Sequence, residues 1–210
     1  MERIICLLIG YVFGLFQTAY FYGKSKGIDI RQYGSGNSGT TNALRVLGTK
    51  AGLIVLLGDC LKCIAAVTVV RMIYGDHQEI IYLLCLYGGA GAVLGHNFPF
   101  YLKFKGGKGI AVLAGLVLAT GLVMVPIPLT AFLIAVLLTR YVSLGSLLAS
   151  SMFFLEVLFY GQLGGFDMAF QYRMELYVLV FLLMALAWVR HKENIKRLLA
   201  GTENPFRSKK

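Results

Sequence analysis

Charged residues are scarce in this chain of 210 residues, since Asp, Glu, Lys and Arg together make up only 14%, whereas soluble domains carry about 25%. Apolar residues reach 58%, and the mean hydropathy is +0.72. A soluble domain of this length has too little interior to hide so much apolar surface. The composition excludes a water-soluble enzyme, a disordered chain and a disulfide-stapled secreted module, and it predicts an integral membrane protein.

Acidic residues are half as common as basic ones, with 10 Asp and Glu against 20 Lys and Arg and a net charge of +10. In a soluble protein this imbalance would indicate a nucleic-acid partner. Here the basic residues lie almost entirely between apolar runs, which is typical of loops that face the cytoplasm. We therefore expect membrane lipid around the protein and no nucleic-acid partner.

Cysteine is also rare, and its four copies all lie in apolar segments, where a thiol behaves as a small hydrophobe. Cys60 and Cys63 have C-x-x-C spacing, but neither a second pair nor a histidine cluster accompanies them. This pattern disfavours a redox role, and we predict no metal and no cofactor.

Six apolar runs cover 4–22, 51–70, 80–95, 110–139, 143–160 and 176–189. The first is uncharged for 19 residues, and no small-x-small cleavage site follows it. We interpret it as a retained membrane span rather than a signal peptide.

The run 110–139 has two possible structures. As one helix its 30 residues would be about 45 Å long, against a hydrocarbon core of about 30 Å. Gly121, Pro126 and Pro128 near its middle favour a turn instead. A tight hairpin of two short helices and one long tilted helix both fit the length.

Charge favours the hairpin. With seven spans, one side of the membrane holds 16 Lys and Arg residues, in 23–50, 96–109, Arg140 and the tail from Arg190. The other side holds Arg3, Arg71 and Arg173, and Lys62 lies inside a span. The positive-inside rule then predicts a single domain, 1–210, forming an all-α seven-transmembrane-helix bundle with the N-terminus outside and the C-terminus cytoplasmic. We expect Lys209 and Lys210 to form a solvated basic tail.

The first of three polar segments, 33–42, contains Gly34, Gly36 and Gly39 in G-x-G-x-x-G spacing, with Asp59 twenty residues beyond the last glycine. A membrane span, and not a strand, precedes this segment, and Asp59 lies inside the next span. This context excludes a dinucleotide-binding fold.

The same glycines let backbone N–H groups converge on an anion. If Thr41 or Asn42 opens the next helix, its positive end faces that point, and Arg45 follows within one turn. Ser35 and Asn37 supply further donors. We favour phosphate or carboxylate binding over a flexible loop that only caps the helix.

The second polar segment runs from 96 to 109. It lacks the residues of a P-loop, but Lys105 and Lys108 bracket Gly106 and Gly107 and make a compact cationic nest. The alternative is that the segment only anchors the protein at the cytoplasmic surface, with basic residues beside interfacial aromatic residues. This would explain Lys103 well but the glycines poorly.

The third segment runs from 191 to 203. His191, Asn194 and Ile195 share one helical face, and Gly201 is typical of a helix stop. The alternative is a solvated basic tail.

Two opposite charges fall inside a predicted span. Asp59 and Lys62 are three residues apart, so they can pair on one helix. Charges inside a membrane are costly and indicate function by default, although a scaffold ion pair explains them equally well.

Several stretches together resemble the bacterial acyl-phosphate:glycerol-3-phosphate acyltransferases, the PlsY family. They are GSGNSGTTNALR at 34–45, DCLK at 59–62, GHNFP at 95–99, FKGGKG at 104–109, RYVSL at 140–144, HKENIKRL at 191–198 and GTE at 201–203. Each stretch alone is weak, whereas the set, in the family's order and hydropathy, is specific. Ser38, Thr40 and Cys63 depart from the family's usual Pro, Ala and Gly.

The resemblance implies a seven-helix enzyme of the bacterial cytoplasmic membrane, with its active site facing the cytoplasm. It implies transfer of a fatty acyl group from long-chain acyl phosphate to glycerol 3-phosphate, giving lysophosphatidic acid and phosphate in phospholipid biosynthesis. It further implies no direct use of acyl-CoA or acyl carrier protein, and a functional link to the enzyme that produces the acyl phosphate.

The family motifs also imply roles for single residues. Ser35, Arg45, His191 and Asn194 would be catalytic, the nest from Lys105 to Lys108 would bind glycerol 3-phosphate, and Glu203 would be a structural partner. Our interpretation of the residues adds further members of the first loop as substrate-binding and the intramembrane pair as structural, namely Gly34, Gly36, Asn37, Thr41, Asn42, Asp59 and Lys62.

As a mechanism we predict direct attack of the glycerol hydroxyl on the acyl carbonyl, with phosphates held by Arg45 and the lysines. The proton goes to the departing phosphate or to His191. The rival route makes Ser35 a covalent nucleophile, although no Asp-x-x-x-His box lies beside it. Two other classes stay open: a phosphate-ester transporter, for which we find no internal repeat, and a membrane scaffold, which leaves the glycine loops unexplained.

Overall fold

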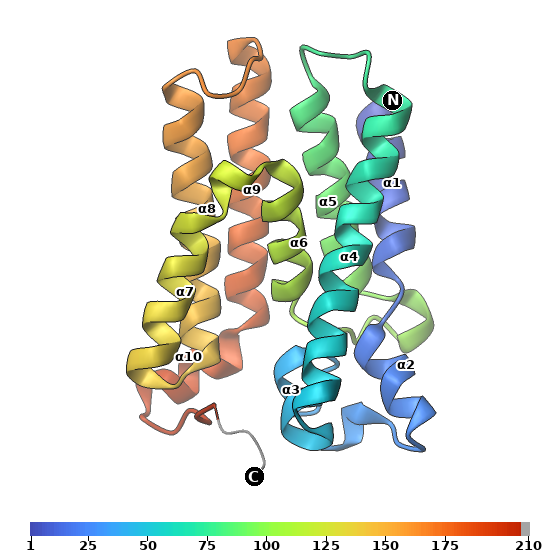
Figure 1. The fold of residues 1–210 in the computed structure, drawn as a ribbon, viewed down its shortest axis with the longest axis vertical. Helices are drawn as coiled ribbons and strands as arrows, with labels where there is room; N and C mark the ends of the chain where they lie inside the picture. Colours follow the sequence, from blue (N-terminus) through green and yellow to red (C-terminus); the bar gives the residue numbers. More distant parts are fainter. Residues whose placement is uncertain (207–210) are drawn as a thin grey trace.

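A computed structural model describes residues 1–206, so Lys209 and Lys210 lie outside the described residues. Every regular element within 1–206 is helical (Figure 1). The α-helices are α1 (Glu2–Gly14), α2 (Thr18–Ser25), α3 (Thr40–Leu47), α4 (Thr49–Tyr74), α5 (Ile81–Asn97), α6 (Ile110–Thr120), α7 (Pro126–Thr139), α8 (Val142–Gln162), α9 (Phe170–Arg190) and α10 (Lys192–Leu199). Short 3-10 helices are η1 (Ile30–Gln32), η2 (Phe100–Leu102) and η3 (Leu122–Met124).

Within 1–206, six helical segments are long and apolar enough to cross a membrane. They are Glu2–Ser25, Thr49–Tyr74, Ile81–Leu102, Leu122–Thr139, Val142–Gln162 and Phe170–Arg190. The prediction of an all-α integral membrane protein is confirmed, with six of the seven predicted spans meeting these criteria.

The run 110–139 forms two helices that reverse direction, as the charge distribution predicted, although α6 packs mainly on α4 and α7 on α8 and the two do not form the tight pair that was expected. Gly121, whose φ of 149° favours glycine, ends α6, and Pro126 opens α7 where its missing N–H costs nothing. The 11 residues of α6 span about 16 Å, too little to cross the hydrocarbon core alone. The turn of the hairpin stops short of the end that α4, α5, α8 and α9 reach (Figure 1).

The N-terminus and the last described residues, up to 206, lie at opposite ends of the bundle (Figure 1). The amphipathic helices α3 and α10 lie at the same end as the C-terminal part of the chain, and the α5–α6 loop lies toward that end. The three polar segments are therefore collected on one side of the bundle. That this side faces the cytoplasm stays a prediction.

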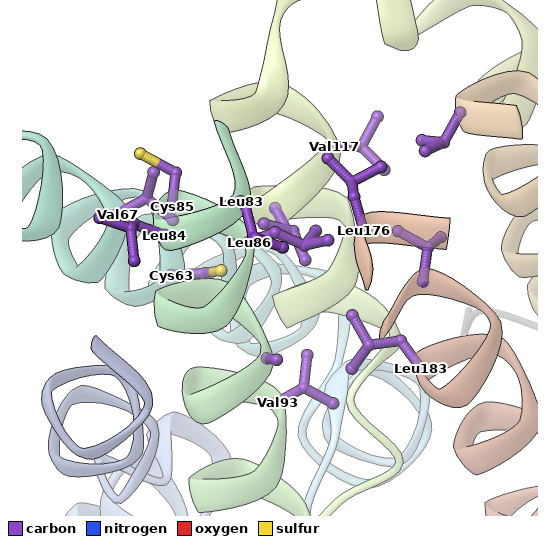
Figure 2. Close-up of a cluster of buried hydrophobic side chains, with 14 of the residues drawn as sticks. Cys63, Val67, Leu83, Leu84, Cys85, Leu86, Val93, Val117, Leu176 and Leu183 are labelled. Carbon is purple, nitrogen blue, oxygen red and sulfur yellow. The ribbon is translucent and has the colours of Figure 1, made fainter. Parts of the chain in front are cut away.

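The centre of the bundle is α5, whose glycines let α1 pack against its backbone. A Cβ on Gly91 would lie 2.1 Å from the carbonyl oxygen of Leu7, and one on Gly10 would lie 1.8 Å from that of Gly88. Small residues at such contacts are how membrane helices approach closely. Side chains of α4, α5, α6 and α9 fill the neighbouring apolar core, in which Cys63 and Cys85 are free thiols (Figure 2).

We expect Gly91→Val to lower the free energy of unfolding by about 1–3 kcal/mol, because the added carbons must push two backbones apart. Thermal unfolding in detergent micelles measures this as a lower Tm. The control is Ala114→Val, which adds two carbons, against three in Gly91→Val, at an exposed position of α6. Equal Tm values for the two variants would contradict the close α1–α5 contact.

Candidate active site

The turn at Gly106 and Gly107 is held on two sides through hydrogen bonds of its own backbone. The N–H groups of Gly106 and Gly107 donate to the carbonyl oxygens of Asn97 (3.2 Å) and His96 (3.1 Å) at the end of α5. The Arg190 guanidinium of α9 donates to the carbonyl oxygens of both glycines, at 3.1 and 2.9 Å. The turn is thereby clamped between α5 and α9.

This clamp corrects one expectation. Gly106 and Gly107 were expected to take part in a cationic nest that binds glycerol 3-phosphate, but their N–H groups already donate within the protein. The glycines are required for space, since a Cβ on Gly106 would lie 1.9 Å from the His96 carbonyl oxygen. They shape the nest, and Lys105, exposed, and Lys108, half-buried, supply its charge.

Lys108 points toward the third polar segment. Its Nζ donates to Oδ1 of Asn194 in α10. Burial lowers the pKa of Lys108 to about 8, the carboxylate of Glu203 opposes this shift, and the positive charges of Arg197, Arg190 and Arg45 add to it. The structure therefore joins the second and third predicted segments at this contact, and Arg45, just beyond the first segment, lies near enough for its charge to lower the pKa of Lys108.

Glu203 holds the third segment together. One carboxylate oxygen accepts from Nδ2 of Asn194 at 2.9 Å, and the other accepts from Nε of Arg197 at 3.0 Å. Only 8% of Glu203 is exposed. This pairing fixes Asn194, and through it the position of Lys108.

His191 lies just beyond α9 and is buried. Its Nδ1 lies 2.7 Å from the carbonyl oxygen of Ala187, and because a carbonyl only accepts, Nδ1 carries the proton and Nε2 keeps its lone pair. Burial and the nearby charge of Lys108 lower the pKa of His191 to about 4. The ring is therefore neutral at pH 7 and offers a proton acceptor.

Asn42, in the first turn of α3, is a structural residue that shapes the preceding loop, which we call the first loop. Its Oδ1 accepts from the N–H of Ser35 at 2.8 Å, and its Nδ2 donates to the carbonyl oxygens of Ile30 (3.2 Å) and Tyr33 (3.0 Å). A Cβ on Gly34 would lie 2.3 Å from that Oδ1. Asn42 was expected to supply a donor to an anion, but its side chain is occupied in shaping the loop.

The other predicted site residues of this loop and of α3 are exposed or half-buried. Gly36 has a φ of 69°, and Ser35 is exposed. Asn37 and Thr41 are half-buried before and within the first turn of α3, and Arg45 is half-buried in its last turn.

Gln17, which was not predicted as part of the site, joins the first loop to the second. Gln17 is fully buried at the break between α1 and α2. Its Nε2 donates to the carbonyl oxygen of His96 at 3.1 Å, and its Oε1 accepts from Ser38 at 3.4 Å. A single amide inside the apolar run 4–22 was the signal available in the sequence. Ser38, a departure from the family pattern, is used here as a buried donor.

The predicted pair of Asp59 and Lys62 is confirmed as an ion pair, with 2.8 Å between Nζ and Oδ1. Lys62 also lies 2.7 Å from the carbonyl oxygen of Phe16 and 2.8 Å from Nδ1 of His96. Thr18 donates to Asp59 at 2.9 Å. His96 was recognised only as part of a motif and not as a member of this cluster.

A family model described as glycerol-3-phosphate acyltransferase matches residues 4–201. The chain belongs to this family. Among its curated members, glycerol-3-phosphate acyltransferase of Thermoanaerobacter sp. (strain X514) is 38% identical over 210 residues, covering 100% of this chain and 98% of the relative. The same-named protein of Halalkalibacterium halodurans is 40% identical over 218 residues, with the same coverage.

Solved structures of the acyltransferase family have the same fold. The crystal structure of PlsY (YgiH), an integral membrane glycerol 3-phosphate acyltransferase, in its glycerol 3-phosphate form matches with a TM-score of 0.85 and 32% identity, covering 99% of this chain and 96% of that one. The lysophosphatidic acid form matches with a TM-score of 0.80 and 31% identity. The family resemblance stated from the motifs is confirmed.

Proposed function

We propose that this protein transfers a fatty acyl group from a long-chain acyl phosphate to glycerol 3-phosphate, forming lysophosphatidic acid and inorganic phosphate. The observation that carries the proposal is the contact of Lys108 with Asn194, close to Arg45, Arg190 and Arg197. Both substrates carry phosphate, and a partly buried cluster of cations between glycine-shaped loops is suited to bind them. Membership of the acyltransferase family supports the acceptor, and the motif resemblance supports the acyl phosphate donor.

In the mechanism we infer, the glycerol hydroxyl attacks the acyl carbonyl carbon, and the bond from that carbon to the phosphate oxygen breaks. Lys108 and Arg45 hold phosphate groups, and Ser35 with Asn194 orients the reacting atoms. His191 accepts the hydroxyl proton at Nε2, since its Nδ1 proton is held by Ala187. The departing phosphate is the alternative acceptor of that proton.

A covalent Ser35 intermediate is the weaker route. Ser35 is exposed, and within residues 1–206 its hydroxyl has no hydrogen-bonded histidine to activate it. Incubating the protein with acyl phosphate alone tests this. An acyl mass on the Ser35 peptide would overturn direct attack.

We also propose that the protein lies in the cytoplasmic membrane of a bacterium with the site at the cytoplasmic face. This placement follows from the Lys and Arg asymmetry of the loops. It gives the site access to glycerol 3-phosphate from the cytoplasm and to an acyl donor delivered by the enzyme that produces acyl phosphate.

The decisive experiment measures phosphate release by purified protein given palmitoyl phosphate and glycerol 3-phosphate, with palmitoyl-CoA as a parallel donor. We expect release that needs both substrates, fails with the CoA donor and is lost in Ser35→Ala. No release by folded protein in a lipid environment would overturn the proposal. Uptake of phosphate esters into proteoliposomes would then support a transporter.

The lowered pKa of Lys108 predicts a pH dependence of substrate affinity. The ammonium is mostly charged at pH 7, half charged near pH 8 and mostly neutral above that. KM for glycerol 3-phosphate should therefore about double by pH 8 and then approach a rise of about tenfold per pH unit. Lys108→Arg should remove this rise because a guanidinium stays charged. A flat KM between pH 7 and 9.5 in the unmodified protein would contradict the assignment.

A further inference from the structure

We propose that Asp59, Lys62 and His96 form a buried positioning triad that holds the Gly106–Gly107 turn, and with it Lys108, in the geometry needed to bind phosphate. All three side chains are buried, with 1%, 7% and 2% exposed. They come from α4 and α5, not from the loop they hold. The kinetic part of this inference rests on the proposed acyltransferase function, whereas its structural part does not.

Lys62 sets the protonation of the His96 ring. A lysine ammonium has three N–H donors and no acceptor, and Nζ of Lys62 has three acceptors at 2.7–2.8 Å, namely Oδ1 of Asp59, the carbonyl oxygen of Phe16 and Nδ1 of His96. Since Nδ1 of His96 must accept, the ring proton sits on Nε2. Asp59, held by Thr18, in turn fixes the direction of Lys62.

The other edge of the His96 ring faces the turn. A Cβ on Gly107 would lie only 2.1 Å from Nε2 of His96, so the ring fills the space beside Gly107. The carbonyl oxygen of His96 also accepts the N–H of Gly107 at 3.1 Å. The ring and the backbone of one residue therefore both locate Gly107, the residue that precedes Lys108.

Arg190 completes the clamp from α9, and Lys108 then reaches Asn194. Without Lys62, Nδ1 of His96 loses its donor, and the ring is free to turn away from Gly107. The turn would then lose its support on the α5 side. A shift of about 1 Å in a substrate-positioning group can cost about 100-fold in catalytic efficiency. Asp59, Lys62 and His96 are accordingly positioning residues, which act through Lys108.

The first experiment compares Lys62→Met with the double variant Asp59→Asn/Lys62→Met, which leaves no unpaired buried charge. In both we expect a higher KM for glycerol 3-phosphate, with a loss of kcat/KM of about 100-fold, and kcat less affected. We also expect faster hydrogen exchange at the amides of Gly106 and Gly107, measured without substrate.

The matched control is Glu175→Gln, which removes the bidentate ion pair with Arg3 (2.5 and 2.8 Å) between α9 and α1 near the opposite end of the bundle. It tests whether breaking any ion pair of the bundle has the same effect. We expect neither the KM nor the exchange of Gly106 and Gly107 to change. Equal effects in Glu175→Gln and Lys62→Met would reduce the triad to general stability and overturn the inference.

A second experiment uses size compensation at the His96–Gly107 contact. Gly107→Ala should raise KM because its Cβ clashes with the ring, and His96→Asn should raise it because the ring no longer supports the turn. The double variant His96→Asn/Gly107→Ala should have a KM about tenfold below the product of the two single effects, a rescue typical of residues in contact. Asn removes the ring edge and keeps an acceptor for Lys62. Gly106→Ala is the control, because its Cβ would meet the His96 backbone, and His96→Asn should not rescue it.

The outcomes separate the two proposals. Rescue of Gly107→Ala but not of Gly106→Ala supports the triad, and rescue of neither overturns it. If the unmodified protein releases no phosphate, the proposed function fails, and the exchange of Gly106 and Gly107 still decides whether the triad holds the turn.

Discussion

His191→Ala is expected to lower kcat for phosphate release by about 1000-fold, within the range for loss of a general base. The reason is the fixed tautomer, in which Ala187 holds the Nδ1 proton and leaves the Nε2 lone pair for the glycerol hydroxyl. KM for glycerol 3-phosphate should change little, because a neutral imidazole adds no charge for binding phosphate. Steady-state kinetics in detergent or lipid cubic phase measures both constants.

The control is His77→Ala. His77 is exposed in the α4–α5 connection, where its Nε2 lies 3.1 Å from Glu2 near the N-terminal end of the bundle. This variant should keep full activity. If His191→Ala retains a kcat near that of the unmodified protein, the departing phosphate takes the proton, and His191 is not the base.

The second large effect is expected from Lys108→Met, which should lower kcat/KM for glycerol 3-phosphate by about 30- to 100-fold, the equivalent of about 2–3 kcal/mol for a lost charged hydrogen bond. The substitution removes the donor to Asn194 and one charge of the phosphate site. Isothermal titration with glycerol 3-phosphate provides a measurement that is independent of turnover.

Lys103→Met is the matched control, because Lys103 is exposed, in the same loop and of the same charge. An equal loss in both variants would indicate that only the total charge of the loop matters. In that case Lys108 would have no specific contact with phosphate.

Local patterns were sufficient for the membrane-spanning part of the fold. Long uncharged runs identified the spans. In lipid a segment must pair its backbone groups within its own helix, and only apolar side chains can face the lipid without cost. Gly121 and the prolines favoured a turn in the run 110–139, because their backbone limits are local, and the distribution of Lys and Arg then favoured two helices over one. The length of α6 was not predictable in this way. An apolar residue fits equally well in the middle of the membrane and near its surface, so hydropathy does not show where within the membrane the turn lies.

The candidate site was only partly predictable. Its ionisable members, Lys108, Arg45 and His191, could be listed because polar residues are rare in this chain. The hydrogen bonds that hold the Gly106–Gly107 turn could not be listed, because Asn97, Arg190 and the two glycines meet only where α5, α9 and the second loop come together. Gln17 and His96 were passed over for the same reason.

By itself, then, the sequence determined that this is a helical membrane protein with three polar segments on one side, and the motifs indicated its family. Hydropathy and the positions of Lys and Arg are properties of each segment alone, so they can be recognised in the sequence without knowledge of the tertiary contacts. Only the tertiary structure decided that Asn42, Gly106 and Gly107 shape the loops while Lys108 and His191 face the site. Which donors stay free depends on hydrogen bonds between residues far apart in the sequence, such as Arg190 with Gly106, 84 positions away, and no local pattern contains these.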